Sequence, residues 1–302
     1  MNQAPPTPKG FRDIDPILAK KRRDVINKII AVLEEFGFVP IETPTIEFAD
    51  TLTGKYGEEE RLIYKFTDRG GRDLALRYDL TVPFARYVAT YNPPLPFRRY
   101  QIGQVFRGEN PQAGRYREFM QFDFDTVGSS DLEEDARIIT AALKSAKAAG
   151  LAKAQMAIND RAAFANVHLD VVRAIDKIHK VEKEQLKAEL KQKGRRANEI
   201  KLLDEIENAQ MTSNLKSVFG LLEPLGLKEN KDFFFDPTLA RGLDYYTGSI
   251  FEMKPGDDPR ALSIGSGGRY DNLIGMFGKN PVPAVGFSFG LDRLVESVNS
   301  EL

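Results

Sequence analysis

The spacing of apolar side chains predicts three amphipathic helices. From 16 to 36 apolar residues recur every three or four positions, and Gly37 provides a natural stop. A second helix is expected over 131–149, because this segment opens with an aspartate and an acidic first turn and is followed by Gly150. An apolar stripe over 291–298 predicts a closing helix.

Elsewhere apolar residues alternate with polar ones, which predicts strands with mostly short connections. We therefore expect an α+β fold, an antiparallel β-sheet flanked by helices. Segment 38–47 is also extended but contains Pro40 and Pro44, and since proline removes a donor from a strand ladder we expect it at a sheet edge or a subunit boundary. The predicted strands of the sheet are 62–67, 72–79, 98–107, 115–126, 233–236, 247–253 and 284–289.

The composition changes within 157–228, where charged residues are frequent and aromatic residues are few. We expect a small helical insertion here, with the main domain formed by 1–156 and 229–302. The run 177–196 mixes positive and negative charges, so it fits either a solvated helix face or a surface that contacts RNA.

Segment 107–125 combines several kinds of ligand-binding side chain. From 115 onward the residues alternate, so one face of a strand carries guanidinium, aromatic, amide and carboxylate groups in that order. Guanidinium forks suit phosphate, an aromatic ring can stack on a base, and an amide with two carboxylates can hold a cationic or donor-rich group. This order predicts a nucleotide-using enzyme; the alternative is a hairpin with a solvated charged face. The polar face comprises Arg115, Arg117, Phe119, Gln121, Asp123 and Asp125.

The segment 74–87 alternates in the same way. Its pattern places Arg77, Asp79 and Thr81 on one face of an extended chain. The opposite face comprises Leu76, Tyr78 and Leu80.

Composition restricts the chemistry. With 43 Lys and Arg against 44 Asp and Glu, the 302-residue chain has a formal net charge of −1, so contacts with nucleic acid depend on local patches. The chain has no cysteine, which excludes disulfides and cysteine-bound zinc. Its two histidines, His168 and His179, are distant from every motif, which excludes a histidine-based triad at the predicted site. The N-terminus lacks an apolar signal region and no apolar run is long enough for a membrane span, so a cytoplasmic protein is expected.

Three further segments complete the pattern: ARGLDYYTGSIFE at 240–252, GSGGRYDNL at 265–273 and AVGFSFGLDRL at 284–294. Together with 107–125 they resemble the catalytic domain of class II aminoacyl-tRNA synthetases, and specifically histidyl-tRNA synthetase. The resemblance covers nearly the whole chain and is weakest over roughly 155–230.

The resemblance implies a class II sheet with a helical insertion and an ATP-dependent reaction. Histidine would be activated to histidyl-adenylate and transferred to the 3′ end of histidine tRNA. The helix over 16–36 and the strand with Pro44 resemble the dimerisation motif of this class, so a homodimer is expected.

The resemblance gives Arg107 and Arg241 the catalytic role of holding the α-phosphate and the histidine carboxylate from two sides. Because that carboxylate is already ionised at neutral pH, its attack needs no general base. ATP is expected with Mg²⁺, whose protein ligands the sequence leaves unidentified, and no zinc or organic cofactor is implied. The implied ATP-binding residues are Arg107, Glu109, Arg115, Phe119 and Arg293.

For histidine, the resemblance implies that the ammonium group is received by Asp79, Thr81 and Gln121. Asp125 and Tyr246 would read the imidazole nitrogens. Bacterial members often carry a longer acidic side chain at positions 79 and 125, where this chain keeps the charge on aspartate. The full implied set is Asp79, Leu80, Thr81, Arg107, Gln121, Asp125, Arg241, Tyr245, Tyr246 and Tyr270.

The implied macromolecular partner is the acceptor end of histidine tRNA, which would meet the loop 108–114. Gln112 matches a base-reading position of the family, whereas Asn110 lacks the basic side chain often found near there.

The family continues into an anticodon-binding domain, whereas this chain ends at Leu302. We therefore expect a catalytic domain without the anticodon-binding domain. Two other interpretations stay open: a histidine-binding regulatory paralog, such as the ATP phosphoribosyltransferase regulatory subunit, and a dimeric module that binds RNA or protein. Regulatory paralogs tend to lose catalytic arginines, so the presence of Arg107, Arg241 and Arg293 favours the enzyme.

Overall fold

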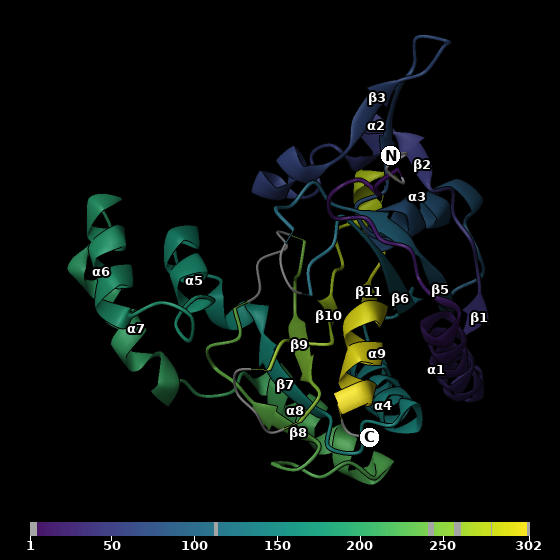
Figure 1. Cartoon of the computed structure of the whole chain (residues 1–302). Coiled ribbons are helices and arrows are strands. Elements are labelled where there is room, and N and C mark those ends of the chain that lie inside the picture. Colours follow the sequence, from purple (N-terminus) through teal and green to yellow (C-terminus); the bar gives the residue numbers. More distant parts are fainter. Residues whose placement is uncertain (1–4, 112–113, 241–244, 257–260, 279, 301–302) are drawn as a thin grey trace.

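The computed structural model describes residues 5–111, 114–240, 245–256, 261–278 and 280–300. Its centre is an eight-stranded sheet (Figure 1). The inner pairs, from β5 across to β7, are antiparallel as predicted, which confirms the α+β fold. In spatial order the strands are β1 (Val39–Pro40), β5 (Phe97–Phe106), β6 (Glu118–Val127), β11 (Ala284–Gly290), β10 (Gly265–Arg269), β9 (Ser249–Lys254), β7 (Gln155–Asp160) and β8 (Phe233–Phe235).

The two edge pairs of this sheet, β1 with β5 and β7 with β8, are parallel. Each edge strand is separated from its partner by a long connection that contains helices, which is the connection a parallel pair requires. The sheet is therefore mixed, whereas a purely antiparallel sheet was predicted.

A second, three-stranded sheet lies beside the first and has the order β2-β4-β3. The segment 38–47, predicted as one interrupted strand, contributes β1 to the large sheet and the start of β2 to the small one, with Pro44 in the bend between them. The predicted strand 72–79 also ends early, at Leu76, and a helix begins at Thr81, so the expected alternation over 74–87 is wrong beyond Leu76. The elements of this part are β2 (Ile46–Phe48), α2 (Ala49–Leu52), η1 (Gly57–Leu62), β3 (Lys65–Thr67), β4 (Asp73–Leu76) and α3 (Thr81–Tyr91).

Four helices pack on one face of the large sheet and form the main hydrophobic core. α1 begins where the Asp15 carboxylate accepts hydrogen bonds from two N–H groups of the first turn, and it buries Val25, Ile29 and Leu33 against the sheet. Phe122 and Phe124 of β6 point into the same core, which confirms the predicted apolar face of that strand. The four helices are α1 (Pro16–Glu35), α4 (Leu132–Ala149), α8 (Ser213–Leu222) and α9 (Leu291–Ser300).

The helices of the predicted insertion have a core of their own, built around residues such as Val171, Leu186 and Leu203. In Figure 1 α5, α6 and α7 stand away from the large sheet. The predicted range 157–228 also takes in most of β7 and all of α8, which pack with the main body because their apolar residues belong to the main core. The remaining elements are η2 (Arg161–Phe164), α5 (Leu169–Ile175), α6 (Lys183–Gln192), α7 (Ala197–Glu205), η3 (Ile206–Asn208), η4 (Glu223–Leu225) and η5 (Ile274–Met276).

Across the described ranges, every helix is too short or too polar to cross a lipid bilayer.

Candidate active site

The face of the large sheet opposite the main core carries a cavity of about 450 Å³. Strands β6, β9, β10 and β11 form its floor, and the segment after β4 and the start of α3 close one side. The sequence-predicted residues that line this cavity are Asp79, Thr81, Arg107, Glu109, Arg115, Phe119, Gln121, Asp125, Tyr245, Tyr246, Tyr270 and Arg293.

Two predicted residues that the structure describes are not among those that line the cavity. Leu80 is fully buried, and Asn110 is exposed. Arg241 and Gln112 lie outside the residues that the structure describes.

One end of the cavity is acidic and is centred on Asp125. Its Oδ1 accepts a hydrogen bond of 2.5 Å from the Tyr270 hydroxyl, and its Oδ2 lies 2.7 Å from Nη2 of Arg99. Burial raises the pKa of Asp125, while Arg99 and the Tyr270 hydrogen bond act in the opposite direction. The carboxylate lies over Gly286 of β11, where a Cβ atom would overlap Oδ1, so glycine makes room for it.

A second buried carboxylate, Asp79, stands at the start of α3. Its Oδ1 accepts hydrogen bonds of 3.0 Å from both the Tyr56 hydroxyl and the Val82 backbone N–H. Burial is the main cause that raises the pKa of Asp79, and the nearby Arg107 opposes it. The helix start therefore fixes this carboxylate at the rim of the acidic end.

Tyrosine rings form the wall of the acidic end. The Tyr245 ring meets the rings of Tyr246 and Tyr270 edge to face, at centroid distances of 5.0 Å and 5.9 Å. Burial raises the pKa of Tyr245 and Tyr270 well above the usual value, so both hydroxyls are neutral donors.

The other end of the cavity is cationic and aromatic. The Arg107 guanidinium lies 4.3 Å from the Tyr78 ring centroid and 5.0 Å from that of Phe119, and its Nε donates to the Tyr78 carbonyl. Arg293 donates to the carbonyls of Gly114 and Ser263. Both guanidinium groups line the cavity, where their positive charge suits phosphate.

Arg115 also reaches this end, where its Nη1 lies 3.6 Å from Oε2 of Glu109. Arg117, expected on the same face, instead donates to the backbone carbonyls of Glu109 and Lys9. The strand begins only at Glu118, so the alternation does not extend back to Arg117.

The expected grouping of Arg77 with Asp79 is wrong for the same kind of reason. Arg77 is buried behind the site and donates to the carbonyls of Thr43 and Gln104. Because the chain turns after β4, Tyr78 lines the cavity in its place.

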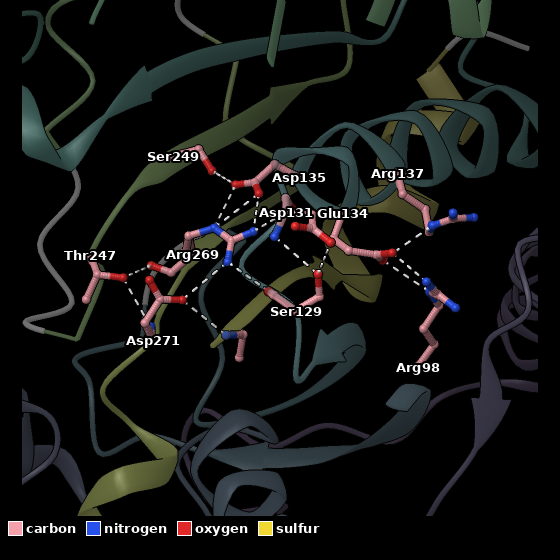
Figure 2. A network of polar contacts seen from close by, with 11 residues as sticks. Arg98, Ser129, Asp131, Glu134, Asp135, Arg137, Thr247, Ser249, Arg269 and Asp271 are labelled. Carbon is pink, nitrogen blue, oxygen red and sulfur yellow. Dashed lines mark hydrogen bonds and ion pairs between the residues drawn. The ribbon is translucent and has the colours of Figure 1, made fainter. Parts of the chain in front are cut away.

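The GGRYD segment is anchored by its arginine rather than exposing it. Figure 2 shows the Arg269 guanidinium between Asp135 of α4, Asp271 and the carbonyls of Ser129 and Asp131. Asp135 is fully buried and also accepts a hydrogen bond from Ser249 of β9. The network joins β10 to α4 and β9, and so fixes the strand that ends next to Tyr270.

Several cavity residues were absent from the predicted set. Asp123 lines the cavity between Gln121 and Asp125, and the alternation of β6 already placed it on the polar face. Asp176 and Lys180 reach the cavity from the insertion, and nothing in the local sequence indicates that contact.

Within the described residues, no group of three or more His, Asp or Glu side chains could hold a metal ion.

Comparison with known proteins identifies the family. The chain matches the family model described as histidyl-tRNA synthetase over residues 10–205 and 169–294. It is 42% identical to a histidine–tRNA ligase of Aeropyrum pernix, over 97% of this chain and 74% of that protein. The chain belongs to the histidyl-tRNA synthetase family.

Other members of the histidyl-tRNA synthetase family agree with this assignment. A cytoplasmic histidine–tRNA ligase of Dictyostelium discoideum is 40% identical over 98% of this chain and 69% of its own length. A solved structure from Bacillus halodurans, described as an ATP phosphoribosyltransferase regulatory subunit/histidyl-tRNA synthetase, superposes with a TM-score of 0.82 at 25% identity, over 97% of this chain and 83% of that one. The chain is thus an aminoacyl-tRNA synthetase, a ligase of protein biosynthesis from an ATP-using family.

Proposed function

We propose that the cavity binds histidine at its acidic end and ATP at its cationic end, and joins them as histidyl-adenylate. The histidine carboxylate attacks the α-phosphorus of ATP, a new oxygen–phosphorus bond forms, and pyrophosphate leaves. The adenylate then passes its histidyl group to a hydroxyl of the terminal ribose of histidine tRNA and releases AMP. The observation that carries this proposal is that Asp125 and Arg107 line one cavity at opposite ends of β6, since Arg107 lies over Phe119 near the start of the strand and Asp125 is near its end.

At the acidic end, Asp125 and Tyr270 would hold the imidazole ring. An imidazole N–H needs an acceptor when it is desolvated, and a buried carboxylate supplies one. Asp79, Thr81 and Gln121 would receive the ammonium group. Gln121 is held for this role by its Nε2, which donates to Ser288 at 3.0 Å and leaves the amide oxygen available for a donor.

At the cationic end, Arg107 would bridge the α-phosphate and the attacking carboxylate. It is held by two aromatic rings, so little reorganisation accompanies the gain of charge on phosphorus. Phe119 and Glu109 would contact adenine, and Arg115 and Arg293 the outer phosphates. Arg241 is proposed as the second catalytic arginine on sequence resemblance alone.

Mg²⁺ would arrive with ATP as part of the substrate. The phosphates then supply most of its oxygen ligands, with carboxylates at the cavity wall as the protein's contribution.

The regulatory function is the second candidate, because the B. halodurans structure carries both names. Against it, Arg107 and Arg293 both line the cavity, where a protein that binds histidine alone has no need of them. Histidine-dependent exchange of pyrophosphate into ATP separates the two functions. We expect exchange well above a control without histidine, whereas histidine binding without exchange would support regulation.

The proposed tRNA contact is the loop 108–114, and Asp176 and Lys180 of the insertion line the same cavity as Glu109 and Gly114. Charging of histidine tRNA and of a minihelix that carries only the acceptor arm tests this assignment. We also propose a homodimer and, from the name of the Dictyostelium relative, a cytoplasmic location.

A further inference from the structure

A fully buried arginine lies directly beneath the acidic end of the cavity. Arg99 is in β5 and is 0% exposed, the largest of the fully buried side chains. It stands opposite Asp125 in the register of β5 and β6. Its guanidinium stacks over the Phe84 ring of α3, with 4.1 Å to the centroid, and its Nη2 reaches to 2.7 Å from Asp125 Oδ2.

Burying an arginine is costly unless its charge has a function or a close partner. The partner here is the carboxylate that we propose to read the imidazole ring. The two oxygens of Asp125 divide their contacts, since Oδ2 meets Arg99 and Oδ1 meets the Tyr270 hydroxyl. Arg99 thus fixes the direction in which Oδ1 points, and its positive charge opposes the effect of burial on the pKa of Asp125.

We propose that Arg99 is a positioning residue that sets the specificity of this enzyme for histidine, by pairing with the Asp125 carboxylate and fixing its orientation below the imidazole ring. This inference rests on the proposed function, because it takes Asp125 as the group that contacts the ring. Arg99 itself is separated from the cavity by Asp125 and by the backbone of Leu80, whose carbonyl it approaches at 3.5 Å.

The adjacent arginine provides a matched control. Arg98 is the preceding residue of β5, so its side chain points to the opposite face of the sheet, where it pairs with Glu134 of α4 (Figure 2). Replacing either arginine by leucine removes one charge and one ion pair from the same strand. Only the Arg99 replacement alters a group at the cavity.

The experiment measures histidine binding and ATP binding separately, by calorimetry, in the full 302-residue chain. We expect Arg99→Leu to raise the Kd for histidine about 10- to 100-fold, the range usual when a group that orients a ligand-binding side chain is removed. The Kd for ATP should change less than about twofold, and Arg98→Leu should change neither. Arg99→Lys keeps the positive charge but loses the planar, forked guanidinium group. Its Kd for histidine should therefore lie between those of wild type and Arg99→Leu.

A double-mutant cycle with Asp125→Asn decides whether Arg99 acts through Asp125. In the Asp125→Asn background, adding Arg99→Leu should change the histidine Kd less than about threefold. An equal loss in both backgrounds, or a parallel loss of ATP binding, would overturn the proposal and leave Arg99 a structural residue. If Arg99→Leu fails to fold, the Arg99→Lys variant carries the same comparison.

Failure of the proposed function would look different. Wild-type protein that binds no histidine would contradict both the proposed function and the role of Arg99. Wild-type protein that binds histidine but catalyses no pyrophosphate exchange would contradict adenylate formation alone. The effect of the Arg99 variants on histidine binding could still be measured.

Discussion

At the residue scale, the site depends on carboxylates kept out of water. Asp79, Asp123 and Asp125 are each less than a tenth exposed and line the same cavity. Arg99 pairs with Asp125, the buried Arg77 acts electrostatically on Asp123, and Arg107 acts in the same way on Asp79. Burial nevertheless raises the pKa of all three carboxyls, so their ionised forms are costly in the empty site and would be stabilised by a ligand that carries N–H donors and positive charge.

Asp125 should therefore determine the choice of amino acid. We expect Asp125→Ala to raise the KM for histidine about 10- to 100-fold in the exchange reaction, because a hydrogen bond to a charged acceptor is lost in a desolvated pocket. The KM for ATP should stay within about twofold. Equal loss of both would show that the residue supports the sheet instead.

Asp123 should make the stability of the empty protein depend on pH. Burial is the main cause that raises its pKa from 3.8 to about 7, with Arg99 lowering it and Asp125 raising it further. Between the unfolded pKa and the raised folded pKa, Asp123 keeps its proton in the folded state but has lost it in the unfolded state. The free energy of unfolding therefore falls as pH rises through this range. Above the folded pKa the whole destabilisation by the buried, ionised carboxylate is present.

Replacing Asp123 by Asn removes that cost. We expect the melting temperature of the variant, measured without ligands, to exceed that of wild type by about 2 °C or more at pH 8, with a smaller difference at pH 5. A difference that does not change with pH would contradict an ionised, buried Asp123.

At the element scale, the fold depends on how β10 is tied to its neighbours. The strand GSGGR contains glycine where backbones approach closely; a Cβ on Gly267 would lie 2.1 Å from the Gly286 carbonyl oxygen. Such a strand buries few side chains of its own. The Arg269 network in Figure 2 supplies the missing attachment, because it joins the end of β10 to α4.

Arg269→Ala should lower the free energy of unfolding by about 3 to 5 kcal/mol, because it leaves Asp135 buried and unpaired. Urea unfolding followed by circular dichroism measures this change. The control is Arg72→Ala, which removes an exposed pair with Asp68 and should lower the free energy of unfolding far less, because solvent screens that pair. Similar losses in both variants would mean that the network contributes little.

Elements with regular patterns could be predicted from the sequence, and those set by distant partners could not. The apolar spacing of α1 predicts a helix, and the alternation of β6 predicts both a strand and its cavity face. Each prediction is possible because the spacing of the residues matches the repeat of the helix or strand backbone. β10 was missed, since glycine shows no alternation. Arg77 and Arg99 look alike in sequence, and only the packing shows that Arg99 pairs with Asp125 whereas Arg77 donates to backbone carbonyls.

At the scale of the whole molecule, the sheet separates two layers with different tasks. Its helix-covered face holds the main core, and its other face holds the cavity. Several large apolar side chains are exposed at the start of α1 and in strands β1 and β2, including Ile17 at 85% and Phe48 at 57%. An apolar surface of this kind is typical of a contact between subunits.

A second copy of the chain is the proposed occupant of this surface, and substitution of Phe48 tests it. We expect light scattering to show a dimer at micromolar concentration, and Phe48→Glu to raise the dimer dissociation constant at least about 30-fold, because a charge replaces an apolar contact at a buried interface. Leu225→Glu is the matched control, since Leu225 is also exposed, at 42%, but follows α8 away from this surface. Wild-type protein that stays monomeric would contradict the proposed homodimer. An equal effect of both substitutions would mean that the dimer contact does not depend on Phe48.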